Sequence, residues 1–196
     1  MSFNVPAEAY ARFMGRYSDP LAGEFIRLVD PQAGDRALDV GCGPGALTAL
    51  LVERLGAGAV SAIDPSEPFV AAARARFPNV VVRQGFAEEL PFADGSFDVT
   101  LAQLVVHFMA DPVGALREMS RVTRPGGLVA ASVWDFGGDR APISVFWRAV
   151  REMDPSSTGE SQLAGAGEGQ LVELFTRAGL HDVHQSVLTI RVGFAG

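Results

Sequence analysis

The chain has 196 residues, of which 48% are hydrophobic, and a formal net charge of −7. That length and composition suit one domain with a buried core, and the charge argues against a nucleic-acid backbone as the main partner. No apolar run is long enough to span a membrane, the first residues lack a signal-peptide pattern, and the single Cys42 excludes an internal disulfide. We therefore expect a soluble, cytoplasmic protein with no membrane partner and no metal site.

Residues 3–30 are predicted to be helical. One amphipathic stripe has the spacing i, i+3, i+4 and i+7: Tyr10, Phe13, Met14 and Tyr17. Pro20 is expected to break this pattern, so that a second short helix, from Leu21 to Val29, leads into the first strand. The stripe either covers the edge of a sheet or closes over a ligand.

The stretch from Ala37 to Gly45 combines a short buried strand with glycines at 41, 43 and 45, and a helix to about Leu55 follows. A strand, a glycine turn and a helix bring backbone close to a nucleotide-like ligand. The glycine spacing also fits a dinucleotide fingerprint. Pro44 lacks an N–H, however, Asp39 adds negative charge, and no basic residue lies between 36 and 54. A ligand with a positive centre and a diol therefore suits this turn better than a pyrophosphate.

The second predicted strand runs from Val60 to Asp64 and ends in a carboxylate, about twenty residues beyond the glycines. A carboxylate in that position accepts hydrogen bonds from both hydroxyls of a ribose. Its alternative role is to cap the next helix, which Pro65 and Ser66 begin and which runs through Arg76.

The run Leu38-Asp-Val-Gly-Cys-Gly-Pro-Gly45 resembles the first motif of the class I S-adenosylmethionine-dependent methyltransferases of the small-molecule type. The resemblance implies a doubly wound, Rossmann-like α/β sheet of order 3-2-1-4-5, S-adenosylmethionine as cofactor and a small-molecule acceptor. Its implied cofactor residues in this turn, bordering the methionine part, are Asp39, Gly41, Cys42 and Gly43, and Asp64 and Pro65 follow on the ribose side.

The phrase Tyr10-x-x-Phe-Met-Gly-Arg-Tyr-Ser18 is similar to the leading segment of small-molecule members, which closes over the cofactor. By this resemblance Arg16 pairs with the methionine carboxylate. Tyr10 and Tyr17 then form walls of the site.

The third predicted strand, 80–83, is followed by Gln84-Gly-Phe-Ala-Glu-Glu-Leu-Pro-Phe92, which resembles the family's adenine segment. Phe86 stands where members commonly carry an acidic residue. Either Phe86 packs on the adenine face or another group accepts from the adenine amino group, and the N–H of Ala87 can bond a ring nitrogen. Glu88 and Glu89 are expected to be solvated charges at a helix start.

The fourth predicted strand delivers Gln103 to the ligand edge of the sheet, where it faces cofactor and acceptor. His107 is a weak candidate for a general base, and its alternative role is a packed or capping histidine. Asp111 and Pro112 supply an N-cap and an N1 proline for a helix to Thr123. The run 111–127 resembles the family closely and is interpreted as scaffold, and the fifth strand is predicted over 128–134.

From Asp135 the resemblance thins. A helix over 142–153 carries an apolar stripe that forms core or roofs an acceptor pocket, 156–169 is predicted to be a loop, and a helix follows from about 168 to 179. Residues 183–192 alternate like a sixth strand. The family's seventh strand is not found, so an exposed sheet edge is expected, through which a homodimer can pair.

The interpretation is a single domain: a helical cap (1–30), a cofactor-binding core (36–134), a variable acceptor-side region (135–180) and a last strand (181–196). The implied reaction is in-line methyl transfer, which needs mainly positioning and desolvation and therefore no visible catalytic constellation. One alternative is a non-catalytic or truncated cofactor-binding module. A less favoured alternative is a nicotinamide-dependent oxidoreductase, which would need a catalytic Tyr or His with a Lys, and the sequence contains no Lys.

Overall fold

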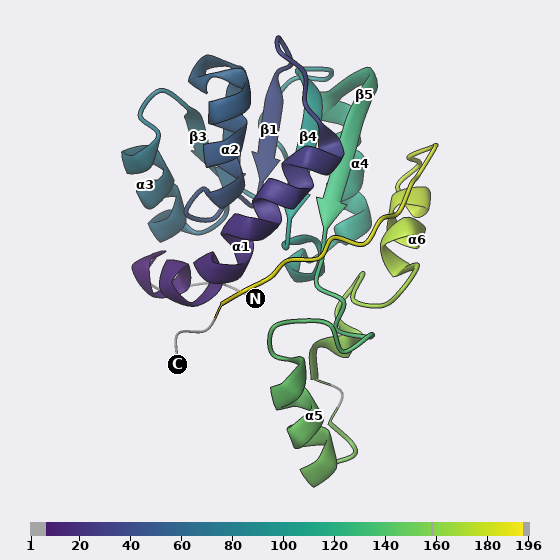
Figure 1. Ribbon diagram of the computed structural model, residues 1–196. Helices are drawn as coiled ribbons and strands as arrows, with labels where there is room; N and C mark the ends of the chain where they lie inside the picture. Colours follow the sequence, from purple (N-terminus) through teal and green to yellow (C-terminus); the bar gives the residue numbers. More distant parts are fainter. Residues whose placement is uncertain (1–6, 158, 194–196) are drawn as a thin grey trace.

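The computed structural model describes residues 7–157 and 159–193. Its centre is a five-stranded parallel sheet of order β3-β2-β1-β4-β5, as predicted (Figure 1). The strands are β1 (Ala37–Val40), β2 (Val60–Asp64), β3 (Val81–Gln84), β4 (Phe97–Gln103) and β5 (Thr123–Ser132). The strand order reverses between β1 and β4, and sheets of this kind bind ligands outside the carboxyl ends of the strands at such a point.

Helices cover both faces of the sheet (Figure 1). On one face lie α1 (Ala7–Val29), α2 (Ala46–Leu55) and α3 (Glu67–Arg76), with Phe25, Leu51 and Val70 in a shared hydrophobic cluster. On the other face lie α4 (Pro112–Val122) and α6 (Gln170–Arg177), with Leu116, Met119 and Phe175 in a second cluster. Among the described residues, no helix is both long and apolar enough to cross a membrane.

Local signals in the sequence fix several of these boundaries. Asp111 caps α4 by accepting a hydrogen bond from the Gly114 N–H at 2.9 Å, and Pro112 occupies the first turn, as expected. Gly56, with φ of 85°, ends α2. β5 begins earlier than predicted, at Thr123. Residues 123–127 belong to the strand as an irregular stretch, because the register against β4 shifts between Phe97 and Val99.

The predicted break at Pro20 is wrong, because α1 is continuous from Ala7 to Val29. An interior proline removes one backbone hydrogen bond and disturbs the preceding turn. Here the Gln103 amide donates to the Ser18 carbonyl in that turn, at 3.0 Å, and Ala22 and Phe25 beyond the proline are fully buried. Tertiary packing therefore outweighs the local signal.

The predicted sixth strand is also wrong. Residues 183–193 form an extended segment that belongs to no sheet, and in Figure 1 it crosses the lower end of the sheet from α6 towards α1. Val183 packs against the cluster under α4 and α6, whereas Leu188 packs against the cluster under α1 and α2. The alternating apolar residues are thus partly buried against the two clusters, although the segment forms no hydrogen-bonded ladder with any strand.

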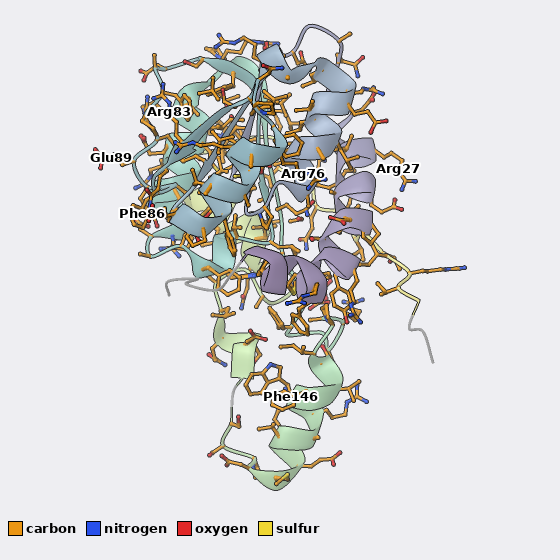
Figure 2. The ribbon with its side chains drawn as sticks, turned by 90° about the vertical axis from the view of Figure 1, so that its left-hand side faces the viewer. Arg27, Arg76, Arg83, Phe86, Glu89 and Phe146 are labelled. Carbon is orange, nitrogen blue, oxygen red and sulfur yellow. The ribbon has the colours of Figure 1, made fainter. Side chains whose placement is uncertain are left out.

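Helix α5 (Ser144–Met153) lies on a lobe that extends away from the sheet, where Figure 2 places Phe146. Most of its apolar stripe does not form core: Phe146 is 58% exposed and Met153 is 88% exposed. The predicted loop of 156–169 contains a short 3-10 helix, Gly159–Gln162, and Glu160 in it accepts a hydrogen bond from the Trp147 indole at 3.0 Å.

Candidate cofactor and acceptor site

The glycine turn is fastened to the carboxyl end of β2. The N–H groups of Gly41 and Cys42 donate to the Ile63 carbonyl at 2.8 and 3.1 Å. A Cβ at Gly41 would lie 2.7 Å from a Val105 methyl, whereas a Cβ at Gly43 would meet nothing within 4 Å. Both glycines have positive φ, 72° and 54°. The backbone at Gly43 therefore borders open space, which a ligand can fill.

Asp64 joins the turn to the start of α3. One carboxylate oxygen accepts from the Gly43 N–H and the other from the Ser66 N–H, both at 2.8 Å. Each oxygen retains a further lone pair for a ligand hydroxyl. Burial raises the pKa of Asp64, and the two backbone N–H groups oppose that rise. The structure brings this carboxylate to the glycine turn, and its ribose role remains a proposal.

Asp39 is buried beneath the turn, and its predicted place in the cofactor site stays a prediction. Its side chain is 1% exposed and accepts a hydrogen bond from the Thr48 hydroxyl at 2.6 Å. Burial raises the pKa of Asp39 to about 7, and the nearby charge of Asp64 adds to the rise. Burial also raises the pKa of the Cys42 thiol, with both aspartates contributing, and its side chain belongs to the first hydrophobic cluster.

The first turns of α1 lie at the carboxyl ends of the strands, as Figure 1 shows. The Tyr10 ring packs on Phe69 of α3 with 5.0 Å between centroids, and Tyr17 meets Trp134 edge-on at 6.3 Å. The pKa of Tyr10 is raised by burial and by the charge of Asp64, which places its hydroxyl within electrostatic reach of that carboxylate. The two tyrosines thus pack against Phe69 and Trp134, and their role as walls of the site stays a prediction.

Gln103 connects β4 to α1. Its amide nitrogen donates to the Ser18 carbonyl, while its oxygen is buried and has no hydrogen-bond partner among the described residues. A buried acceptor without a partner carries a desolvation cost, which a ligand donor relieves.

Four other predicted site residues are less enclosed. Arg16 is exposed on α1 and takes part in none of the ion pairs of the described residues. Phe86 is 66% exposed on the loop after β3, so it is not buried in a pocket (Figure 2). Pro65 is exposed, and its carbonyl accepts from the Gln84 amide at 3.1 Å. Ala87 is half-buried against the second cluster.

His107 has the geometry of the packed alternative. It is 5% exposed, its ring meets Phe108 and Phe136 edge-on, and neither ring nitrogen has a partner in the described part of the chain. Burial lowers the pKa of His107 to about 4. The imidazole is therefore neutral at physiological pH and only weakly basic.

A cavity of about 380 Å³ lies at the ends of β4 and β5, beneath the first turns of α1. Its lining is apolar and aromatic apart from one carboxylate: Tyr10, Phe13, Met14, Leu104, Phe108, Trp134, Phe136, Pro142, Ile143 and Glu160. Sequence reasoning pointed to the α1 stripe and to the helix over 142–153, but it missed the other lining residues, because Trp134 and Phe136 follow β5 with no motif. It also missed Thr48, Val105 and Arg76, whose guanidinium lies 3.5 and 3.4 Å from the Pro44 and Gly45 carbonyls.

These residues fit S-adenosylmethionine. Open space borders Gly43, a carboxylate able to accept a diol ends β2, and the unpartnered Gln103 oxygen can accept from an amine. Residues that would hold the cofactor are thus supplied by β1, β2 and β4, at the point where the strand order reverses.

Comparisons with known proteins agree. The methyltransferase-domain family matches residues 38–131. An uncharacterised methyltransferase of Mycobacterium tuberculosis is 41% identical over 140 residues, which are 71% of this chain and 54% of that protein. The chain therefore spans about half the length of the first curated relatives that it matches. A demethylmenaquinone methyltransferase of Shouchella clausii is 32% identical over 177 residues, covering 81% of this chain and 75% of that protein.

Among solved structures, a chain from the complex of the Haloferax volcanii Trm112 methyltransferase activator with a methyltransferase superposes with a TM-score of 0.74. It is 24% identical and covers 94% of this chain and 80% of its own, a likeness that concerns the fold. The relatives favour methyl transfer over the nicotinamide-dependent alternative. The chain belongs to the class I S-adenosylmethionine-dependent methyltransferases.

Proposed function

We propose that this methyltransferase acts on a small, uncharged, largely apolar ring compound that occupies the aromatic cavity. The observation that carries the proposal is the lining, in which half of the side chains are aromatic and no basic residue takes part. An anionic acceptor would lose its hydration there without gaining a counter-charge. The Shouchella clausii relative, whose name specifies demethylmenaquinone, supports a ring compound. The net charge of −7 disfavours a nucleic acid.

When bound, S-adenosylmethionine would supply a methyl group on a sulfonium, whose carbon an acceptor atom attacks in line while the bond to sulfur breaks and S-adenosylhomocysteine leaves. The residues of the chain position the reactants and exclude water from the site. Tyr10 and Tyr17 close the site from α1, and Asp64 and Gln103 offer acceptors for the donors of the bound cofactor. His107 keeps a neutral ring against Phe108 and Phe136, two residues that line the cavity, so no imidazolium charge opposes an apolar acceptor.

Calorimetric titration tests the proposal against its alternatives. We expect S-adenosylmethionine and S-adenosylhomocysteine to bind, NAD not to bind, and methyl transfer from labelled S-adenosylmethionine to hydroxylated or quinol-type rings but not to their carboxylated analogues. Binding without turnover on any ring compound would favour a non-catalytic module. Preferential turnover of carboxylates would contradict the acceptor class.

Two exposed phenylalanines give a matched pair for the cavity. Phe13 on α1 lines it and is 56% exposed, whereas Phe146 on α5 does not line it and is 58% exposed. Removing a ring that contacts the acceptor costs roughly 1–1.5 kcal/mol. Phe13→Ala should therefore raise the KM for the acceptor about tenfold without changing the affinity for the cofactor, and Phe146→Ala should change neither. Equal effects in steady-state kinetics would place the acceptor elsewhere.

We also propose that two copies pair through the free edge of β5. Within the described residues β5 is bonded only to β4, and Leu128 on it is 43% exposed. Unpaired edges of this kind template further pairing. Sedimentation should show a concentration-dependent dimer that Leu128→Lys weakens, and a monomer at all concentrations would refute this pairing.

A further inference from the structure

The loop after β3, residues 85–94, starts beside the proposed ribose carboxylate. The Gly85 N–H donates to the Asp64 carbonyl at 3.1 Å, which ties the first residue of the loop to the end of β2. Ala87 packs partly into the second hydrophobic cluster, and Leu90, which is 3% exposed, belongs to that cluster. The loop therefore runs from the cofactor turn to the opposite face of the sheet, where α4 lies.

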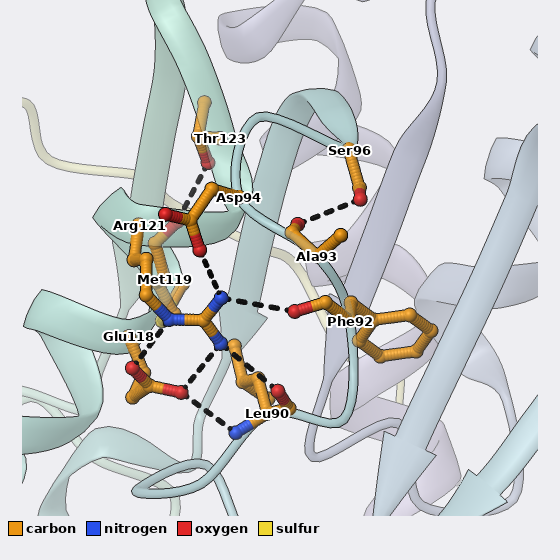
Figure 3. A network of polar contacts seen from close by, with 9 residues as sticks. All are labelled: Leu90, Phe92, Ala93, Asp94, Ser96, Glu118, Met119, Arg121 and Thr123. Atoms are coloured by element: carbon orange, nitrogen blue, oxygen red, sulfur yellow. Dashed lines mark hydrogen bonds and ion pairs between the residues drawn. The ribbon is translucent and has the colours of Figure 1, made fainter.

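Side chains of α4 hold the backbone of this loop (Figure 3). Glu118 accepts a hydrogen bond from the Leu90 N–H at 2.9 Å, and Arg121 donates to the Leu90 carbonyl at 3.0 Å. Both polar groups of one loop residue are thus fixed by two side chains that are themselves paired at 2.7 and 2.8 Å.

Arg121 uses all five of its donors. Nε and one N–H of Nη2 go to Glu118, the other N–H of Nη2 to the Leu90 carbonyl, and those of Nη1 to the Phe92 carbonyl at 2.9 Å and to Asp94 at 2.6 Å. A planar fork with five donors makes this set possible, and the single ammonium of a lysine cannot reproduce it.

A second hold lies at the other end of α4. Glu88, expected from sequence to be a solvated charge, instead accepts from the N–H groups of Ala110 and Asp111 at 2.9 and 3.3 Å. The loop is therefore attached before the first turn of α4 through Glu88 and at its last turn through Arg121. Ala87, whose N–H is the predicted partner of the adenine ring, directly precedes the first attachment.

We propose that Glu118 and Arg121 are positioning residues that keep residues 85–92 in the conformation that meets the cofactor's base. This rests on the proposed function, in which that loop borders the adenine. Ordering an irregular loop costs backbone entropy. Because α4 imposes the order when the chain folds, the cost does not fall on cofactor binding, and the loop presents its N–H groups at fixed places. The segment interpreted from sequence as scaffold thereby takes part in base recognition without touching the ligand.

The test compares Arg121→Lys with Arg124→Lys. Arg124 lies three residues further on, and its guanidinium bonds to Asp98 and to the Pro125 carbonyl rather than to residues 85–94, so it is a matched control. Affinities for S-adenosylhomocysteine and for its inosine analogue, S-inosylhomocysteine, are measured by calorimetry. Arg121→Lys should lower the affinity for S-adenosylhomocysteine about tenfold, which corresponds to about 1.4 kcal/mol. It should also reduce the preference for adenine over hypoxanthine. Amide exchange over 85–92 should quicken, and Arg124→Lys should leave all three readouts unchanged.

A loss of thermal stability with an unchanged adenine preference would mean that the clamp is only structural and would overturn the inference. If Arg121→Lys does not fold, Glu118→Gln, which keeps shape but removes the charge, should show the same loss of preference to a smaller degree. If the unaltered protein binds neither nucleoside, the proposed function itself fails. If Asp64→Ala weakens cofactor binding whereas Arg121→Lys and Glu118→Gln do not, the positioning role is rejected and the proposed function stands.

Discussion

The Asp64→Ala variant is expected to bind S-adenosylmethionine about 10- to 100-fold more weakly than the unaltered protein. A charged acceptor that loses its hydrogen bonds to a ligand costs about 1–3 kcal/mol. Here the loss has two sources, because the variant removes the proposed acceptor for the ribose hydroxyls and also frees the Gly43 and Ser66 N–H groups that hold the turn. Calorimetry or equilibrium dialysis gives the affinity directly.

Asp98→Ala provides the control. Asp98 also accepts a backbone N–H, that of Arg36 at 2.8 Å, and pairs with Arg124, but it lies at the opposite, amino end of the sheet. The Asp98→Ala variant should therefore be less stable to unfolding but should keep the affinity for the cofactor unchanged. If Asp64→Ala binds as well as the unaltered protein, the carboxylate at the end of β2 has no part in the site.

The Asp39→Asn variant is expected to change the pH dependence of folding stability. The native pKa of Asp39 is raised to about 7, whereas an unfolded aspartate titrates near about 3.9. Between these values the native state keeps a proton that the unfolded chain has released, so the free energy of unfolding falls as pH rises. For one group the slope is about 1.4 kcal/mol per pH unit, and the total is of the order of 4 kcal/mol. Asparagine removes this slope and can still bond to Thr48.

His107 acts in the opposite direction. Its native pKa of about 4 lies below the unfolded value of about 6.5, so its contribution is present above pH 6.5 and is lost as the pH falls towards 4. In the unaltered protein the two slopes largely cancel between pH 4 and 6.5. Urea unfolding at pH 4.5, 6 and 7.5 should therefore show stability rising with pH only in Asp39→Asn, with a gain over the unaltered protein that is largest at pH 7.5. Parallel curves would show that Asp39 titrates normally.

The parts of the fold predicted from sequence are those set by local chemistry. A short apolar strand, three glycines and a capped helix determine β1, the turn, α2 and α4. The sheet order 3-2-1-4-5 was expected from the family resemblance, and the structure confirms it. Pro20 and residues 183–193 were predicted wrongly because contacts from distant segments decide them. Ser18 is bonded by Gln103 of β4, and Val183 and Leu188 find partners on different faces of the sheet.

The site also combines residues that the local sequence predicts with contacts that only the fold brings about. Gly43 and Asp64 were found from spacing, and the structure joins them by a hydrogen bond. The burial of Asp39 depends on Thr48 in the next helix, and the attachment of Glu88 depends on backbone N–H groups before α4. Neither has a signal in the residues around it, because each partner is brought near only by the fold.

The extended segment 183–193 touches both hydrophobic clusters, yet no strand in the described chain pairs with it. An apolar strap that is held by a few side chains and lacks a hydrogen-bonded ladder opens at lower free energy than the domain it crosses. Protease cleavage and early amide exchange should therefore concentrate there while the five strands stay closed. The segment that contacts both faces of the sheet is then also the first to unfold locally.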